Sequence, residues 1–116
     1  MEITELRTYI LQPPLSGELG DARAAVAERY WVVVELDTDT GLTGTGWLGT
    51  WTIPDLYERY LRGFEDLLVG SDPLAIEARR REMRERALYY PGEVGFAALP
   101  RSAVDVALWD LKAKAA

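Results

Sequence analysis

The pattern of apolar and polar residues divides the chain into a first half of predicted strands and a second half of predicted helices. Residues 2–11 alternate, which is typical of a half-buried strand near a sheet edge. Residues 30–37 form a β-branched and aromatic run that predicts a strand buried on both faces. Residues 42–48 are expected to return beside it after a turn over residues 37–41. The first half therefore predicts a three-stranded antiparallel meander.

The second half carries helical periodicity. Thr52 and the acidic residue three positions later match a capping box, and apolar residues at helical spacing follow until Gly70, which suits a C-cap. Asp72 and Pro73 are expected to be the N-cap and first residue of a second, charge-rich helix. A third helix is predicted from residue 99 to the end. It is apolar nearly all round, which predicts burial on two sides.

Two glycine-containing stretches add detail to this arrangement. Residues 16–28 hold two glycines and few apolar anchors, and they predict a long mobile loop. Gly44 and Gly46 lie on one face of the returning strand, where they leave room for a close neighbour. We therefore expect an α+β domain over residues 1–116, in which the sheet packs against three helices.

The composition excludes several kinds of chemistry. The chain has no Cys and no His, which excludes disulfides, thiolate nucleophiles, imidazole ligands and a Ser-His-Asp triad. Its net charge of −6 disfavours nucleic acid, and glutamates interrupt the basic run at residues 79–86, which is expected to be a solvated helix face. The apolar runs are too short to span a membrane, and the N-terminus does not resemble a signal peptide. A soluble, cytoplasmic domain is expected.

Some acidic and glycine residues could suggest a metal site or a phosphate-binding loop, but structural roles explain them better. Asp105 and Asp110 are five residues apart on a predicted helix and point to different sides, so we expect no shared metal. Asp105 is expected to pair with an arginine or a backbone group. Gly41, Gly44 and Gly46 run from a hairpin into a strand, whereas a phosphate loop runs from a strand into a helix.

Four segments spread along the chain carry motifs of a known family. Residues 1–15 match an opening strand with a Pro-Leu ending, and residues 38–44 match a hairpin. Residues 69–74 match a G-x-D-P link between two helices. Residues 102–114 match the most specific of the motifs, A-[IV]-D-[IV]-A-x-W-D-x-x-[AG]-K. Together they resemble the N-terminal capping domain of the enolase superfamily, closest to its mandelate racemase branch.

The resemblance implies a fold, an activity and a cofactor. In this family a (β/α)₇β barrel follows the capping domain, and acidic residues of the barrel hold Mg²⁺, which stabilises the enolate formed when a base removes the proton α to a carboxylate. The parent is then a racemase or dehydratase of a hydroxy acid or sugar acid. Because the barrel is absent from these residues, we expect no catalytic residue, no metal ligand and no activity in the chain by itself. The last helix lacks a stop signal after Leu111, which favours a chain that continues.

The resemblance also assigns substrate contacts to two loops that close over the barrel mouth, residues 16–28 and 48–52. The candidate residues in these loops are Leu19, Asp21, Arg23, Val26 and Trp51. Leu19, Val26 and Trp51 match positions whose apolar side chains touch the substrate, and Arg23 suits a carboxylate or hydroxyl. Where many relatives have Glu after the Gly-x-Gly of the third strand, this chain has Trp47, which favours the racemase branch.

A pair of lysines near the end of the chain has the spacing of a catalytic motif but is explained by its position on a helix. Lys112 and Lys114 have the spacing of the family's catalytic Lys-x-Lys, but that motif lies on a barrel strand, whereas cations at a helix C-terminus are favoured in any protein. The expected partners are the missing barrel, a carboxylate substrate in the parent enzyme and further copies in a homo-oligomer.

The alternative hypothesis for the function of the chain is a free-standing protein-interaction module that binds through an exposed sheet or helix face.

Overall fold

The structure is a computed structural model that describes residues 1–14, 19–20, 25–26, 28–86 and 95–116. The main strands are β1 (Ile3–Leu11), β4 (Tyr30–Thr38) and β5 (Thr43–Thr50). The helices are α1 (Pro54–Arg62), α2 (Glu65–Leu68), α3 (Ile76–Arg86) and α4 (Ala98–Ala115), with a single 3₁₀ turn, η1 (Gly95–Ala97), before α4. The predicted α+β class and the order of sheet then helices are confirmed. No helix in these ranges is long and apolar enough to cross a membrane.

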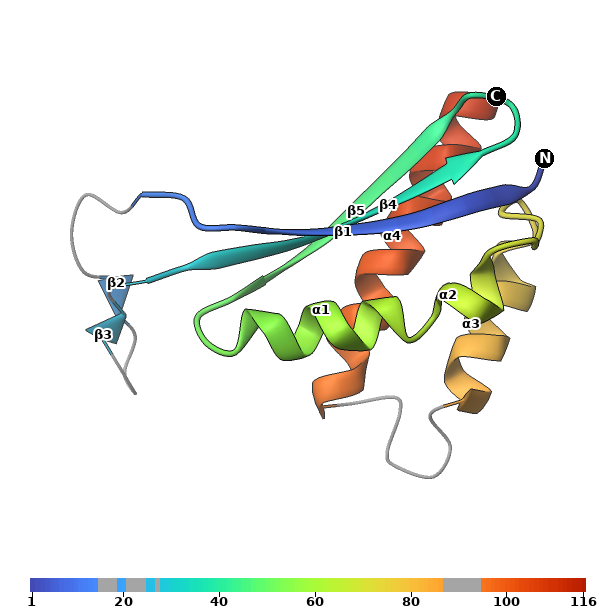
Figure 1. The fold of residues 1–116 in the computed structure, drawn as a ribbon. Helices are drawn as coiled ribbons and strands as arrows, with labels where there is room; N and C mark the ends of the chain where they lie inside the picture. The colour runs from blue at the N-terminus through green and yellow to red at the C-terminus, as the bar shows by residue number, and fades with distance from the viewer. Residues whose placement is uncertain (15–18, 21–24, 27, 87–94) are drawn as a thin grey trace.

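The three main strands form an antiparallel sheet in the order β1-β4-β5. Its inner face carries Val32, Val34 and Leu36 from the central strand, all fully buried. The intervening residues of β4 are only partly buried, so the expectation of burial on both faces is wrong. Figure 1 shows the reason, because the helices gather on one side of the sheet. The described helices and the sheet therefore form two layers, and none of these helices covers the outer face of the sheet.

The last helix packs on β5 at unusually close range. A Cβ atom added at Gly46 would lie 1.8 Å from the carbonyl oxygen of Ala103, and one at Gly44 would lie 2.3 Å from that of Ala107. These glycines leave room for a close neighbour as predicted, and that neighbour is the backbone of α4. The inner side of this helix supplies six buried residues, namely Pro100, Ala103, Val104, Ala107, Leu108 and Leu111.

The outer side of α4 contradicts the expectation that this helix is buried on two sides. Val106 is 45% exposed and Trp109 is 49% exposed, and Leu99 lies on the same helix surface with a similar exposure. These residues are seven and three positions apart, so they form one apolar stripe along the helix. We call Leu99, Val106 and Trp109 the outer stripe.

The first predicted helix begins and ends differently from the expectation. The N-cap of α1 is Ile53, in the left-handed conformation with φ 46°, and no side chain caps the helix. The capping box at Thr52 is therefore wrong. The helical region is also interrupted around Gly63, which separates α1 from the single turn of α2. Gly70 lies one residue beyond the C-cap of α2, and its φ of 87° requires the conformational freedom of glycine.

The second predicted helix starts three residues later than Pro73, at Ile76. Asp72 does accept a hydrogen bond two residues ahead, from the backbone N–H of Leu74 at 2.9 Å, but this bond closes a turn before the helix. Both an N-cap and such a turn use an Asp carboxylate in the same way, and sequence alone does not distinguish them.

A short hairpin interrupts the predicted loop over residues 16–28. Its strands are β2 (Leu19–Gly20) and β3 (Ala25–Val26), which pair antiparallel. The prediction of an irregular loop is wrong for these four residues. The prediction of mobility falls largely on residues outside the described ranges.

Candidate functional site

Both segments to which the family resemblance assigns substrate contacts emerge at one end of the sheet. Leu11 at the end of β1 faces Trp31 near the start of β4, and Trp31 faces Gly49 near the end of β5. The segment that carries the hairpin and the connection from β5 to α1 therefore leave the sheet at the same end. In Figure 1 the hairpin projects beyond this end, and the connection turns back beneath the sheet into α1.

Trp51 lies in the β5–α1 connection and presents its ring to solvent. Its side chain is 44% exposed. The buried hydroxyl of Thr50 donates to the carbonyl oxygen of Thr52 at 2.8 Å, and the backbone N–H of Thr52 donates back to that hydroxyl at 3.3 Å. These two hydrogen bonds join the residues on either side of Trp51 and restrain the backbone of the connection. An exposed apolar ring on a fixed loop is suited to a contact surface.

The hairpin brings two of the candidate residues opposite each other. Leu19 pairs with Val26 across the register of β2 and β3. Asp21 and Arg23 lie outside the described residues, and so do the side chains of Leu19 and Val26. The structure therefore places the backbone of two candidates and the whole of Trp51, all at the same end of the sheet.

An aromatic group at the base of the hairpin was not predicted. The Arg29 guanidinium lies 4.5 Å from the centroid of the Trp31 ring, and Trp31 meets Trp47 edge to face with centroids 4.5 Å apart. Trp47 is 53% exposed on the outer face of the sheet. Gly49 leaves space for the Trp31 ring, whose nearest atom would be 3.3 Å from an added Cβ. Alternation along each strand was readable from sequence, but only the register of β4 and β5 puts Trp31 and Trp47 on the same face.

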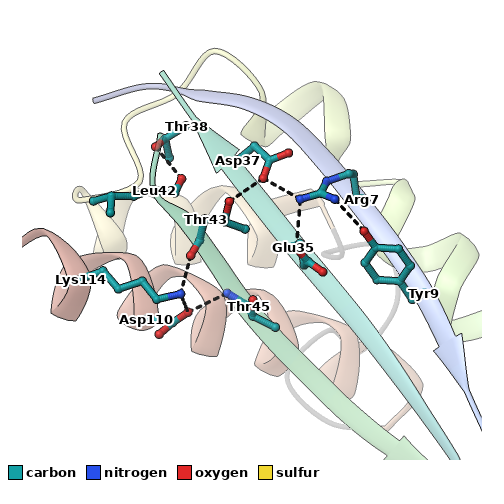
Figure 2. Close-up of polar contacts among 10 residues, drawn as sticks. All are labelled: Arg7, Tyr9, Glu35, Asp37, Thr38, Leu42, Thr43, Thr45, Asp110 and Lys114. Atoms are coloured by element: carbon teal, nitrogen blue, oxygen red, sulfur yellow. Dashed lines mark hydrogen bonds and ion pairs between the residues drawn. The ribbon is translucent and has the colours of Figure 1, made fainter. Parts of the chain in front are cut away.

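The opposite end of the outer face carries a polar network (Figure 2). The Arg7 guanidinium donates to Glu35 at 3.0 Å and to Asp37 at 2.8 Å, and Thr43 also donates to Asp37. The hydrogen bond from Arg7 is the main cause that lowers the pKa of Asp37. Since Arg7 lies between these two carboxylates and already donates to both, they do not fit a magnesium site. No group of three possible metal-binding side chains occurs among the residues that the structure describes.

Asp110 and Lys114 hold the free edge of β5. Asp110 accepts a hydrogen bond from the backbone N–H of Thr45 at 2.9 Å, and Lys114 donates to the carbonyl oxygen of Thr43 at 2.6 Å (Figure 2). Their own ion pair measures 2.9 Å. Lys114, and secondly the N–H of Thr45, lower the pKa of Asp110. We call Asp110 and Lys114 the edge clamp.

The other residues that were assigned structural roles also have structural partners. The Lys112 ammonium lies 4.9 Å from the Trp109 ring, away from the contacts of Lys114, so the two lysines do not converge. Asp105 lies 3.5 Å from the Arg80 guanidinium, as expected for an arginine pair.

Comparison with known proteins identifies relatives over almost the whole chain. Residues 5–116 match the family described as mandelate racemase / muconate lactonizing enzyme, N-terminal domain. A 3,6-anhydro-alpha-L-galactonate cycloisomerase of Streptomyces coelicolor is 34% identical over 95% of the chain. A D-galactonate dehydratase of Ralstonia pickettii is 29% identical over 98% of it.

Solved structures agree with these matches. The crystal structure of a racemase from Streptomyces coelicolor with bound magnesium has a TM-score of 0.83 and 34% identity over 95% of the chain. That of L-talarate dehydratase from Polaromonas, in complex with Mg and L-glucarate, has a TM-score of 0.87 and 26% identity over 98%. The chain spans 31% of the cycloisomerase, 25% of the galactonate dehydratase, 31% of the racemase and 32% of the talarate dehydratase.

Proposed function

Since the chain belongs to the mandelate racemase / muconate lactonizing enzyme family as its N-terminal domain, we propose that it is the substrate-selecting cap of a magnesium-dependent enzyme. That enzyme removes the proton α to a carboxylate of a hydroxy acid or sugar acid, as a racemase or a dehydratase. The relatives support this substrate class, because their names include a cycloisomerase and dehydratases of sugar acids.

The observation that carries the proposal is the common position of the hairpin and the Trp51 connection. Both leave the sheet at the end marked by Leu11, Trp31 and Gly49. Two loops with apolar residues at one end of a sheet can close together over an opening, exclude water and select the substrate by shape. Trp51 supplies the apolar contact area. Leu19 and Val26 supply it from the hairpin, and Asp21 and Arg23 supply polar contacts there.

Magnesium would be held by the rest of the enzyme. When bound, the metal stabilises the negative charge that develops on the substrate carboxylate. Asp37 and Glu35 do not fit that role because they are paired with Arg7, and neither does Asp110, which is paired with Lys114; no group of three possible ligands occurs among the described residues. The chain itself would orient the substrate and keep water out.

The outer stripe of α4 is proposed as the surface on which the following domain rests. Val106 and Trp109 are apolar, about half exposed and aligned on the helix that ends the chain. In the complete enzyme this contact would fix the cap over the active site. The same contact would cover apolar surface of Val106 and Trp109 that the described residues leave exposed.

The test uses the complete product of the gene and a panel of hydroxy acids and sugar acids with Mg²⁺. Exchange of the α-proton in deuterated water and dehydration are both measured. We expect activity on part of the panel, and we expect Trp51→Ala to lower kcat/KM by about tenfold or more through the lost apolar contact. Trp51→Phe is the matched control and should retain most activity.

Two results would overturn the proposal. One is a gene product without Mg²⁺-dependent activity on any such acid, which would favour the interaction module. The other is a Trp51→Ala enzyme with unchanged kcat/KM across the panel. The 116-residue chain alone is expected to show neither activity nor a stoichiometric magnesium site by calorimetry.

A further inference from the structure

A hollow between α3 and α4 is lined by arginines from both helices. Its volume is about 430 Å³, within the range of small-molecule sites, and the buried side chain of Met83 lies in its wall. Arg80 and Arg84 face it from α3, and Arg101 and Ser102 face it from the first turns of α4. This hollow is remote in sequence from the candidate loops and has no role in the proposed function.

The charge around the hollow is opposite to that of the chain. Four guanidinium groups and two carboxylates surround it and the adjoining groove, those of Arg80, Arg81, Arg84, Arg101, Glu77 and Asp105. The chain as a whole carries −6. A concave surface with a local positive excess concentrates anions, even on an acidic protein.

Arg101 differs from an arginine on a solvated helix face. It is partly buried, and no hydrogen bond or ion pair to its guanidinium is found within the described ranges; its Nε atom is buried without a partner. Other arginines of the same region are paired, Arg79 with Glu82 and Arg86 with Asp66. A partly desolvated cation without a counter-charge is unfavourable, and a bound anion would remove that cost.

Arg80 stands across the hollow in a position to share the same anion. It reaches Glu77 at 2.9 Å through one terminal nitrogen and Asp105 at 3.5 Å through Nε. These contacts fix its guanidinium in the wall of the hollow that Arg101 also lines. Arg80 from α3 and Arg101 from α4 line both the hollow and the adjoining groove, so an incoming anion meets a cation from each helix.

We propose that this hollow binds a small anion with two or more charged oxygens, a phosphate or a dicarboxylate. Arg80 and Arg101 would hold it, with the Ser102 hydroxyl as a further donor. Guanidinium groups bind both kinds of oxyanion through paired N–H donors, which accounts for the shared chemistry.

The experiment titrates the chain with inorganic phosphate and, separately, with succinate, while backbone amide shifts are recorded by NMR. Sodium chloride at matched ionic strength is the reference. We expect saturable shifts confined to residues 80–84 and 98–105, with a dissociation constant of about 1 mM or below for at least one probe. Saturation by phosphate alone identifies a phosphate site, and saturation by succinate alone identifies a dicarboxylate site.

Arg101→Gln tests the central residue, and Arg62→Gln is the control because it removes the same charge from α1. We expect Arg101→Gln to weaken binding by about tenfold and Arg62→Gln by less than about twofold. Because Arg101 has no described partner to lose, its variant should keep the thermal midpoint of the parent chain. Equal loss in both variants, or shifts that chloride reproduces, would overturn the proposal.

Discussion

Gly46 is the point of closest approach between the sheet and the last helix, so the first prediction concerns this residue. Gly46→Ala would place a Cβ 1.8 Å from the Ala103 carbonyl oxygen, and backbone must shift to relieve it. We expect a loss of about 3 kcal/mol in unfolding free energy, as for severe overpacking. Gly49→Ala is the matched control on the same strand, since the nearest atoms to its Cβ would belong to side chains and not to backbone, with the Trp31 ring at 3.3 Å and the Arg29 guanidinium at 3.8 Å. Urea denaturation that gives equal losses for the two variants would contradict this account.

Asp110 gives the second prediction, on pH. Its folded pKa is lowered by Lys114 and by the N–H of Thr45, so the unfolded state binds the proton more readily. The stabilisation is therefore complete above the ordinary Asp pKa and is lost as the pH falls through the folded value. Asp110→Asn should cost about 1 kcal/mol near neutral pH, and the difference from the parent should shrink toward about pH 3.

Denaturation of both proteins at several pH values measures this difference. Asp39→Asn provides a comparison, because Asp39 accepts a hydrogen bond from the backbone of Glu2 but lies in no ion pair among the described residues. A cost for Asp110→Asn that stays constant with pH would exclude the edge clamp as its source.

The residues of the candidate site were only partly accessible from sequence. Trp51 could be placed because the β5–α1 connection follows a clear strand, and its exposure agrees with a contact role. The Arg29–Trp31–Trp47 group was missed, because strand register was not yet known and only register puts positions 31 and 47 on one face. Arg101 was missed for a similar reason, because its proximity to Arg80 depends on how two helices pack.

At the scale of the elements, the start of α1 is strained and leads to a third prediction. Ile53 has a φ of 46°, is followed by Pro54 and is 41% exposed. A β-branched residue in this conformation costs about 1–2 kcal/mol, and Asn tolerates it better. Ile53→Asn should therefore raise the unfolding free energy by up to about 1 kcal/mol, measured by thermal unfolding. Ile53→Val keeps the β-branch and should change the unfolding free energy little. A loss of unfolding free energy in Ile53→Asn would contradict the prediction, because the packing of the Ile53 side chain would then outweigh the backbone strain.

The main strands and α4 were predictable because their apolar pattern is long and regular. The hairpin strands contain two residues each, which is too short for an alternating pattern of apolar and polar residues to be recognised. The break between α1 and α2 depends on tertiary packing, because Phe64 turns into the core just after Gly63. Helix boundaries were therefore the weakest part of the prediction, as at Ile53 and Ile76.

At the scale of the whole molecule, the outer stripe predicts self-association of the isolated chain. Val106 and Trp109 expose apolar surface that has no partner within the described domain. We expect concentration-dependent dimers or larger species by sedimentation velocity. Val106→Glu should weaken this association by about tenfold or more, since it places a charge in the stripe.

The same substitution should leave the fold intact, because the side chain of Val106 is nearly half exposed. Glu65→Gln on α2, an exposed position elsewhere, is the control and should associate like the parent. A monodisperse monomer at every concentration would argue against the stripe as a covered surface and for the free-standing module.

The arrangement of α4 on β5 also determines when the domain can form during synthesis. The strands leave the ribosome first and α1, which contacts β1 and β4, follows them, but α4, which packs along β5, comes after all the other described elements. Until Leu111 has emerged, the part of the inner face along β5 lacks the helix that packs on it, and its apolar surface is exposed. Translation thus completes the cap only at its final helix. In a longer enzyme the next domain would begin to emerge just as this one closes, so the ribosome would present the outer stripe to its partner from the moment it forms.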